Sequence, residues 1–339
     1  MNKLDDVVER DRLALVGVAK NCGKTTTLNS LLQLRKQRGM TPPALLSVGV
    51  DGESEDFLIK TKKPPIAVQS GQWLVSAERA IERSFVHVEY VRELDFSTPL
   101  GRVLICRVLD EGTVVLAGLR HREEVVTALQ ALGSLGQDTI WVDGAYGRVA
   151  GAHPEVTDAV VVATGAVAGR DVESIAACTE SLISRLVLDE AVDPVRRKLI
   201  ARAVDEGQVF LLHDERGAQR LSIKSAVVGL HRVRERWSQS IEAIAIPGLI
   251  SDRVTEELLA VCEDRRRTLL VTDGTAFHID DRLWQRLRRR WDIRALDSVD
   301  LAAISYNPTS PGGDRVPGDS LVETLAAIRA DTPVFNPLQ

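Results

Sequence analysis

The sequence predicts an α/β protein with a doubly wound sheet around a phosphate-binding loop (P-loop), appended antiparallel strands and a second α/β lobe. First, Gly-Lys-Thr at residues 23–25 stands between an apolar run and a segment of helical spacing, the context that a P-loop requires. Second, apolar runs alternate with segments of helical periodicity along most of the chain. Third, 339 residues exceed one average domain, which favours two lobes.

The first predicted unit is a strand, a loop and a helix. Residues 13–17 form a short apolar run closed by glycine, and residues 25–37 carry leucines at roughly helical spacing. Residues 44–50 form a second candidate for a buried strand, which ends at Asp51, where polarity rises. Active-site loops of doubly wound sheets lie at such strand ends.

The middle of the chain combines antiparallel strands with further strand-helix units. Between residues 86 and 118 apolar positions alternate with polar ones, which is typical of antiparallel strands. Helical spacing over 122–135 precedes an apolar strand at 139–142. Residues 158–164 form another predicted strand, and 171–188 a long amphipathic helix.

A domain boundary is expected near residue 190, because Asp193-Pro194 is a helix-start signal. We therefore predict a nucleotide-binding domain at 1–190 and a second α/β domain, a partner or substrate lobe, at 191–339. Helices and strands alternate in this second part. The predicted helices are 194–204, 252–264, 280–290 and 319–329, and the predicted strands are 208–212, 242–246, 268–272 and 301–305.

Composition narrows the class of partner. A net charge of -5 and a pI near 5.8 argue against nucleic acid or an anionic membrane as the main partner, since both reward a concentrated positive face. The four cysteines lie far apart with no CxxC pair, which indicates reduced cytosolic thiols. The N-terminus is charged and no apolar run approaches about 18 residues, so a cytoplasmic location is expected.

The loop VGVAKNCGKTTT predicts a site for ATP and Mg²⁺, although five residues separate Gly17 from Gly23 where the usual pattern has four. In a P-loop, backbone N–H groups at the positive end of a helix point at the phosphates. Lys24 would add its charge to the β- and γ-phosphates, and the Thr25 hydroxyl would ligate Mg²⁺. The predicted nucleotide contacts are Gly17, Lys20, Asn21, Cys22, Gly23, Lys24, Thr25 and Thr26.

Two acids are candidates for holding the metal together with Thr25. Asp143 ends the apolar strand at 139–142 and is followed by glycine, a Walker B pattern; the alternative is an ordinary strand-end turn. Asp51 ends the strand that follows the P-loop, where it would ligate the metal or orient water; the alternative is a surface loop. Lys24 and Asp51 are the predicted catalytic residues.

Two other motifs have simpler explanations. Asn2-Lys3-Leu4-Asp5 matches the guanine-reading pattern but precedes the P-loop and follows no strand, so ATP is favoured over GTP without being decided. The arginine runs 265–267 and 286–290, with Trp284 and Trp291, could form a nucleic-acid face. A solvated helix end is preferred because the chain is acidic.

Several separated motifs carry a family resemblance. The five-residue loop spacing is similar to that of dethiobiotin synthetase and related enzymes. The partitioning ATPases belong to the same branch of P-loop proteins and carry a signature lysine at the position of Ala19. In this chain the nearest lysine is Lys20, one position further on. Together the motifs resemble the P-loop subunit of the reactivase of adenosylcobalamin-dependent lysine 5,6-aminomutase and similar aminomutases. They are VGVAKNCGKTTTLN, LLSVGVDGE, KTKKPPIAV, DGAYGR, DAVVVATGAV, LLVTDGT and YNPTSPGG. The chain departs from this pattern at Val50, where the family is expected to have arginine, and at residues 146–148, where a more acidic stretch is expected.

The resemblance implies a slow or partner-stimulated ATPase that acts as a chaperone. Its nucleotide cycle would open the cofactor site of a cobalamin-dependent aminomutase so that damaged cobalamin can leave, and a second reactivase subunit could take part. One alternative is a ligase similar to dethiobiotin synthetase, which phosphorylates a small carboxylate. Another is a scaffold that nucleotide only stabilises.

Overall fold

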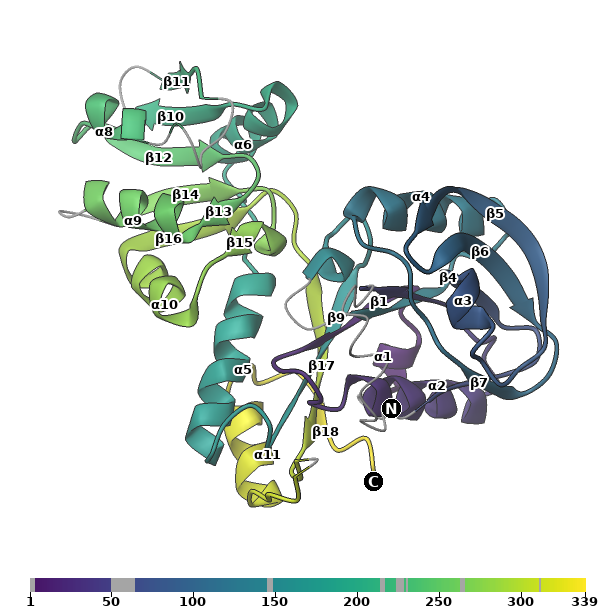
Figure 1. Ribbon diagram of the computed structural model, residues 1–339. Helices are drawn as coiled ribbons and strands as arrows, with labels where there is room; N and C mark the ends of the chain where they lie inside the picture. Colours follow the sequence, from purple (N-terminus) through teal and green to yellow (C-terminus); the bar gives the residue numbers. More distant parts are fainter. Residues whose placement is uncertain are drawn as a thin grey trace. The chain divides into compact units, whose positions relative to one another are not determined.

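A computed structural model describes residues 4–49, 65–144, 149–213, 217–223, 229, 231–262, 266–310 and 312–339. The protein is of the α/β class, as predicted, and divides into two compact units (Figure 1). Unit 1 comprises Met1–Glu180 and Asp300–Gln339, and unit 2 comprises Ser181–Val299. Within the described part of the chain, no helix is long and apolar enough to cross a bilayer.

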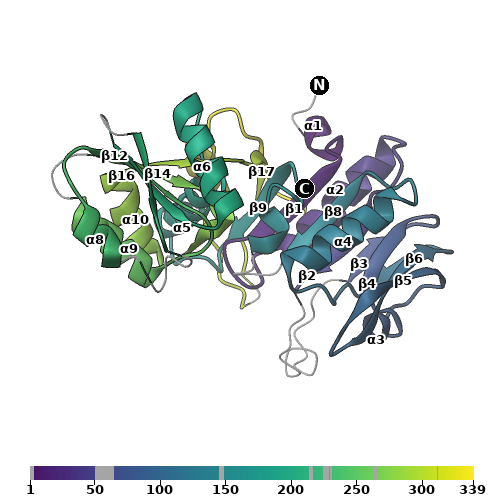
Figure 2. The same cartoon turned by 90° about the horizontal axis from the view of Figure 1, so that it is seen from above.

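Unit 1 is built on a mixed sheet of nine strands among the described residues, in the order β18-β17-β9-β1-β8-β2-β4-β6-β5. The pairs from β18 to β4 are parallel, whereas β6 pairs antiparallel with both β4 and β5 at one end of the sheet (Figure 2). The strands are β1 (Arg12–Gly17), β2 (Ala44–Val48), β4 (Trp73–Ala77), β5 (Val88–Thr98), β6 (Gly101–Val108), β8 (Ile140–Gly144), β9 (Ala159–Gly165), β17 (Asp300–Asn307) and β18 (Val334–Phe335). A separate antiparallel pair joins β3 (Ile66–Val68) to β7 (Gly112–Val114).

Helices cover both faces of this sheet, and α2 and α4 lie on opposite sides of it (Figure 1). Leu13 and Leu15 of β1 pack in one cluster with Leu28 and Leu31 of α2, because alternate residues of a strand point to the same face. The helical segments of this unit are α1 (Asp5–Val8), α2 (Lys24–Gln37), α3 (Glu78–Ile81), α4 (Arg122–Gly133), η1 (Val149–Ala152), α11 (Gly318–Ala326) and the greater part of α5 (Val172–Leu186).

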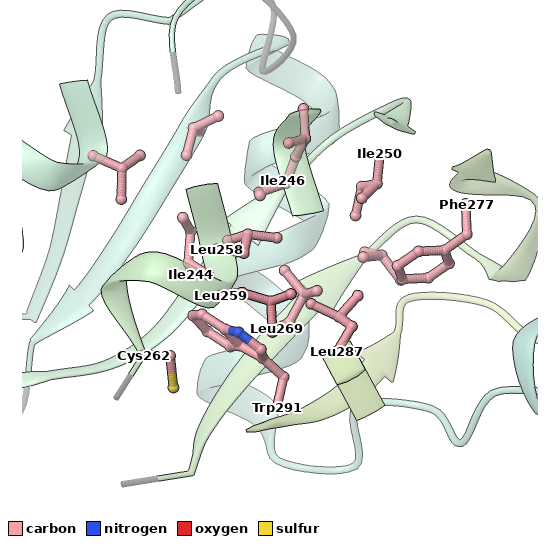
Figure 3. Close-up of a cluster of buried hydrophobic side chains, with 14 of the residues drawn as sticks. Ile244, Ile246, Ile250, Leu258, Leu259, Cys262, Leu269, Phe277, Leu287 and Trp291 are labelled. Carbon is pink, nitrogen blue, oxygen red and sulfur yellow. The ribbon is translucent and has the colours of Figure 1, made fainter. Parts of the chain in front are cut away.

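Unit 2 has its own sheet, in the order β11-β10-β12-β14-β16. Its larger core contains Leu258 and Leu259 of α9, Leu287 of α10 and the fully buried Trp291 (Figure 3). The strands are β10 (Val209–His213), β11 (Gly217–Leu221), β12 (Ile241–Ile246), β14 (Arg267–Val271) and β16 (Trp291–Ala295), with β13 (Ile250–Ser251) and β15 (Phe277–His278) paired separately. The helical segments are α6 (Pro194–Glu206), α8 (His231–Arg236), α9 (Asp252–Val261), η2 (Gly274–Ala276) and α10 (Asp281–Arg290).

The division into units differs from the predicted boundary at residue 190 and from the predicted domain 191–339. Unit 2 begins at Ser181, and the chain returns to unit 1 at Asp300. The reason is strand pairing: β17 runs parallel to β9, from Asp300 opposite Ala159 to Asn307 opposite Gly165. Pairing between strands so far apart in the chain leaves no signal in local periodicity.

Candidate functional site

Five parallel strands of unit 1, β2, β8, β1, β9 and β17, end at one edge of the sheet. Val48 of β2 lies opposite Gly144 of β8, and Gly17 of β1 lies opposite Ala163 of β9. In open α/β sheets, ligands bind outside the carboxyl ends of the strands. The loop between β1 and α2 leaves the sheet at this edge, so it is the first place to look for a site.

This loop turns through two residues in the left-handed backbone region. Asn21 has a φ of 62° and Gly23 a φ of 102°, and α2 begins directly afterwards at Lys24. Glycine adopts this conformation without a steric penalty, and asparagine tolerates it better than most residues. The Val18 amide donates to the Ala163 carbonyl at 3.0 Å, which ties the beginning of the loop to β9. The loop therefore folds back toward the sheet before the helix begins.

Gly17 lies where the loop closes over the end of β1. A Cβ atom at this position would stand 2.5 Å from Sγ of Cys22 and 2.8 Å from Nζ of Lys24. The Cys22 side chain is buried, and the Lys24 side chain reaches back from the beginning of the helix over Gly17. A side chain at this position would displace Cys22 or Lys24, which favours glycine. Gly17 nevertheless stands one residue further from Gly23 than in the common spacing.

The partial positive charge at the beginning of α2 is not offset by any residue of the helix itself. Its N-cap, Gly23, has no side-chain cap, and no acidic residue lies in the first turn. The first helical amides have no intrahelical acceptor, and the helix dipole places partial positive charge at this end. Lys24 adds a full charge, while Thr25 is buried and Thr26 half-buried beside it. Helix N-termini with these features suit an anion.

Asp143 lies at the same edge, on the strand next to β1. It is 4% exposed and stands opposite Leu15 of β1 and Ser47 of β2 in the sheet register. The following residue, Gly144, has no room for a side chain, because a Cβ there would lie 2.5 Å from the Leu15 carbonyl oxygen. The structure thus brings a buried carboxyl to the strand end where sequence analysis expected a metal-binding acid.

The remaining predicted residues fall in two groups. Lys20 and Asn21 belong to the loop and are exposed. Asp51 lies outside the described residues, although β2 ends at the same edge as β1 and β8. Residues 146–148, which belong to the DGAYGR motif, also lie outside the described part of the chain.

Asn307, at the end of β17, is a site residue that sequence analysis did not single out. A Cβ atom on Gly23 would lie 3.7 Å from the Cβ of Asn307, so the two residues are neighbours. The Asn307 side chain accepts from the Thr309 amide at 3.0 Å, and its carbonyl accepts from the Ala166 amide at 2.9 Å. The available signal was a polar residue near the end of an apolar strand: Asn307 stands two residues after the predicted strand at 301–305.

A buried hydroxyl pair also joins α2 to β17. Thr27 Oγ1 donates to the Gly23 carbonyl at 3.0 Å and shares a 2.6 Å hydrogen bond with the Ser305 hydroxyl. Both Thr27 and Ser305 are buried. The last segment of the chain therefore forms one wall of the loop, although some 280 residues separate it from Gly23.

Three large side chains of unit 2, His213, Trp284 and Trp291, have structural roles. His213 is buried between the Ser240 hydroxyl at 3.0 Å and the Gln219 side-chain oxygen at 3.1 Å. Trp284 and Trp291 are buried in the core, so neither can stack on a nucleic-acid base.

Comparison with known proteins gives no family assignment. No protein-family model matches the chain, and a search of curated proteins finds no match.

Proposed function

We propose that the protein has a P-loop nucleoside-triphosphatase fold and binds Mg-ATP at residues 17–26. The observation that carries this proposal is the closed packing of Gly17, Cys22 and Lys24, directly before an uncapped helix. In a loop with these features, the backbone amides and the lysine point toward one place, where a phosphate group can bind. Asn307 lies beside this part of the loop, next to Gly23.

The residues of the loop fit a nucleoside triphosphate with its magnesium ion. The amides at the start of α2 and the Lys24 ammonium would hold the phosphates, and the Thr25 hydroxyl and the Asp143 carboxylate would hold Mg²⁺. Oxygen ligands of this kind are the ones that Mg²⁺ prefers. Mg-ATP supplies a phosphoryl group whose charge the metal neutralises.

Each side chain then has a defined task. Lys24 would stabilise negative charge that develops on the phosphate oxygens, because its ammonium lies close to Gly17 of the loop. Asp51, as the predicted catalytic acid beside the metal, would orient the attacking water.

We further propose that hydrolysis serves a chaperone cycle on an adenosylcobalamin-dependent aminomutase in the cytoplasm. The support is the resemblance of seven separated motifs to the P-loop subunit of the aminomutase reactivase. Two of them, the P-loop motif and YNPTSPGG, lie far apart in the sequence and contribute neighbouring residues, Gly23 and Asn307, to one site. Nucleotide-dependent affinity for the mutase would drive the exchange of damaged cofactor.

The test is phosphate release from ATP by the purified full-length chain. We expect slow hydrolysis that a substrate-inactivated aminomutase accelerates and that Lys24→Ala abolishes. Hydrolysis that instead requires a small carboxylic acid would favour the ligase similar to dethiobiotin synthetase. The scaffold would be favoured if the parent protein hydrolyses no ATP and Lys24→Ala only lowers the melting temperature. Absence of ATP binding would contradict all three.

A further inference from the structure

Helix α10 of unit 2 presents a basic face to solvent. Leu283, Trp284 and Leu287 are buried in the core of the unit, and Figure 3 shows Leu287 pointing into it. The other side of the helix carries three exposed arginines: Arg282, Arg286 and Arg289. Their spacing of four and three residues places them in one row along the helix, here called the α10 arginine face.

The α10 arginine face has no acidic partner within the part of the chain that the structure describes. Elsewhere in unit 2, several arginines form ion pairs with neighbouring carboxylates. Examples are Arg202 and Arg220 with Glu206, Arg234 with Glu257, and Arg294 with Asp189 and Asp292. The arginines of the α10 row differ in this respect from the paired arginines just named.

The helix itself does not account for the row. Cations near the last turn are stabilised by the helix dipole, and Arg290 in addition donates to the Cys262 carbonyl at 3.0 Å. Arg282, however, lies in the first turn, where the dipole disfavours a positive charge. Arg286 is four residues from Arg282 and three from Arg289, and like charges at these spacings destabilise a helix. The row would be stabilised by a negatively charged surface from outside.

We propose that the α10 arginine face binds an acidic segment of a partner protein. Guanidinium groups pair with carboxylates in a bidentate geometry, which gives a short row of arginines specificity as well as charge. The row extends from Arg282 to Arg289, a rise of about 10 Å along the helix axis, which matches two turns of an acidic helix. Nucleic acid fits less well, because the chain is acidic overall and the tryptophans of α10 and β16 are buried.

This inference goes beyond the proposed nucleotide site and does not depend on it. The arginine face lies entirely on unit 2, whereas the residues of the loop belong to unit 1. Lys24→Ala should therefore leave binding at the α10 arginine face unchanged. Failure of one proposal would not be mistaken for failure of the other.

The test uses full-length protein and a fluorescein-labelled helical peptide of about 20 residues, rich in alanine, with glutamates at the spacing of the arginines. Binding is followed by fluorescence anisotropy. The Arg282→Ala/Arg286→Ala/Arg289→Ala variant should bind about tenfold more weakly than the parent, the size expected of three exposed ion pairs. Binding should also weaken as salt is raised. The control, Arg202→Ala/Arg220→Ala/Arg294→Ala, removes the same charge and should bind as the parent does.

Three results would overturn the proposal. The parent protein could fail to bind the peptide at low salt. Both triple variants could lose the same affinity, which would show a response to net charge alone. An oligothymidylate of equal charge could bind the parent more tightly than the peptide and lose that affinity in the α10 variant, which would assign the face to nucleic acid. Circular dichroism checks that both variants are folded. This is expected for the α10 variant, because alanine is the strongest helix former.

Discussion

Gly17→Ala tests the closed packing on which the proposed site depends. The added Cβ would lie 2.5 Å from Cys22 Sγ and 2.8 Å from Lys24 Nζ. Favourable contacts between carbon atoms are about 3.5–4.0 Å, so each of these approaches is short by roughly 1 Å. Overpacking of this kind costs about 1–3 kcal/mol. For a unit of this size, each kcal/mol lowers the melting temperature by about 2–4 °C.

The assay is urea unfolding of three variants beside the parent, with ATP binding measured on each. Gly133→Ala at the end of α4 is the control, because its Cβ would meet only a side-chain oxygen at 3.8 Å. Adding Cys22→Ala to Gly17→Ala should recover stability, since the sulfur is gone. ATP binding should stay weak in that double variant, because the new methyl group still displaces Lys24. Equal unfolding midpoints for Gly17→Ala, Gly133→Ala and the parent would refute the packing argument.

Three further outcomes follow from other contacts. Gly165→Ala should unfold the protein or lower its melting temperature by more than Gly17→Ala does. The reason is that its Cβ would lie 2.1 Å from a backbone oxygen of β17 and that its φ of 153° is strained for alanine. Thermal melts of both variants test this order. Burial raises the pKa of the Cys106 thiol to about 12. Iodoacetamide at mildly alkaline pH should therefore label Cys178 first and Cys106 only after unfolding, which peptide mass spectrometry would detect. The hydrogen bond from Arg102 lowers the pKa of the half-buried Glu78 carboxyl. Its contribution to stability is present above the ordinary carboxyl pKa and lost as pH falls through the lowered one, so the difference between the parent and Glu78→Gln should vanish in acid; a pH-independent difference would contradict this.

The parts of the site that are local in sequence could be predicted from it. The strand before the loop, the helix after it and the acid at the end of β8 each leave a short signal: an apolar run, a glycine or a change of polarity. Gly17 was identified in this way, and the structure adds the reason, which is the approach of Cys22 and Lys24. Local patterns of this kind depend only on neighbours in the chain.

The return of the chain to unit 1 could not be predicted, because it depends on contacts between distant residues. Residues 301–305 read as a strand of the second domain, yet β17 pairs with β9 and carries Asn307 to the loop. The burial of Trp291 was equally hidden, because it begins β16, for which the sequence predicted no strand. The ion pairing of the arginines depends in the same way on tertiary neighbours.

The central claim is that residues 17–26 bind Mg-ATP, and isothermal titration calorimetry of the full-length chain tests it most directly. The parent should bind Mg-ATP saturably, and Lys24→Ala should weaken the affinity by at least about tenfold, the loss expected when a charged hydrogen bond is removed. Lys198→Ala, which removes the same charge from an exposed position on α6, should bind as the parent does. Equal affinities of the parent and Lys24→Ala, or no binding by a folded parent, would contradict the account.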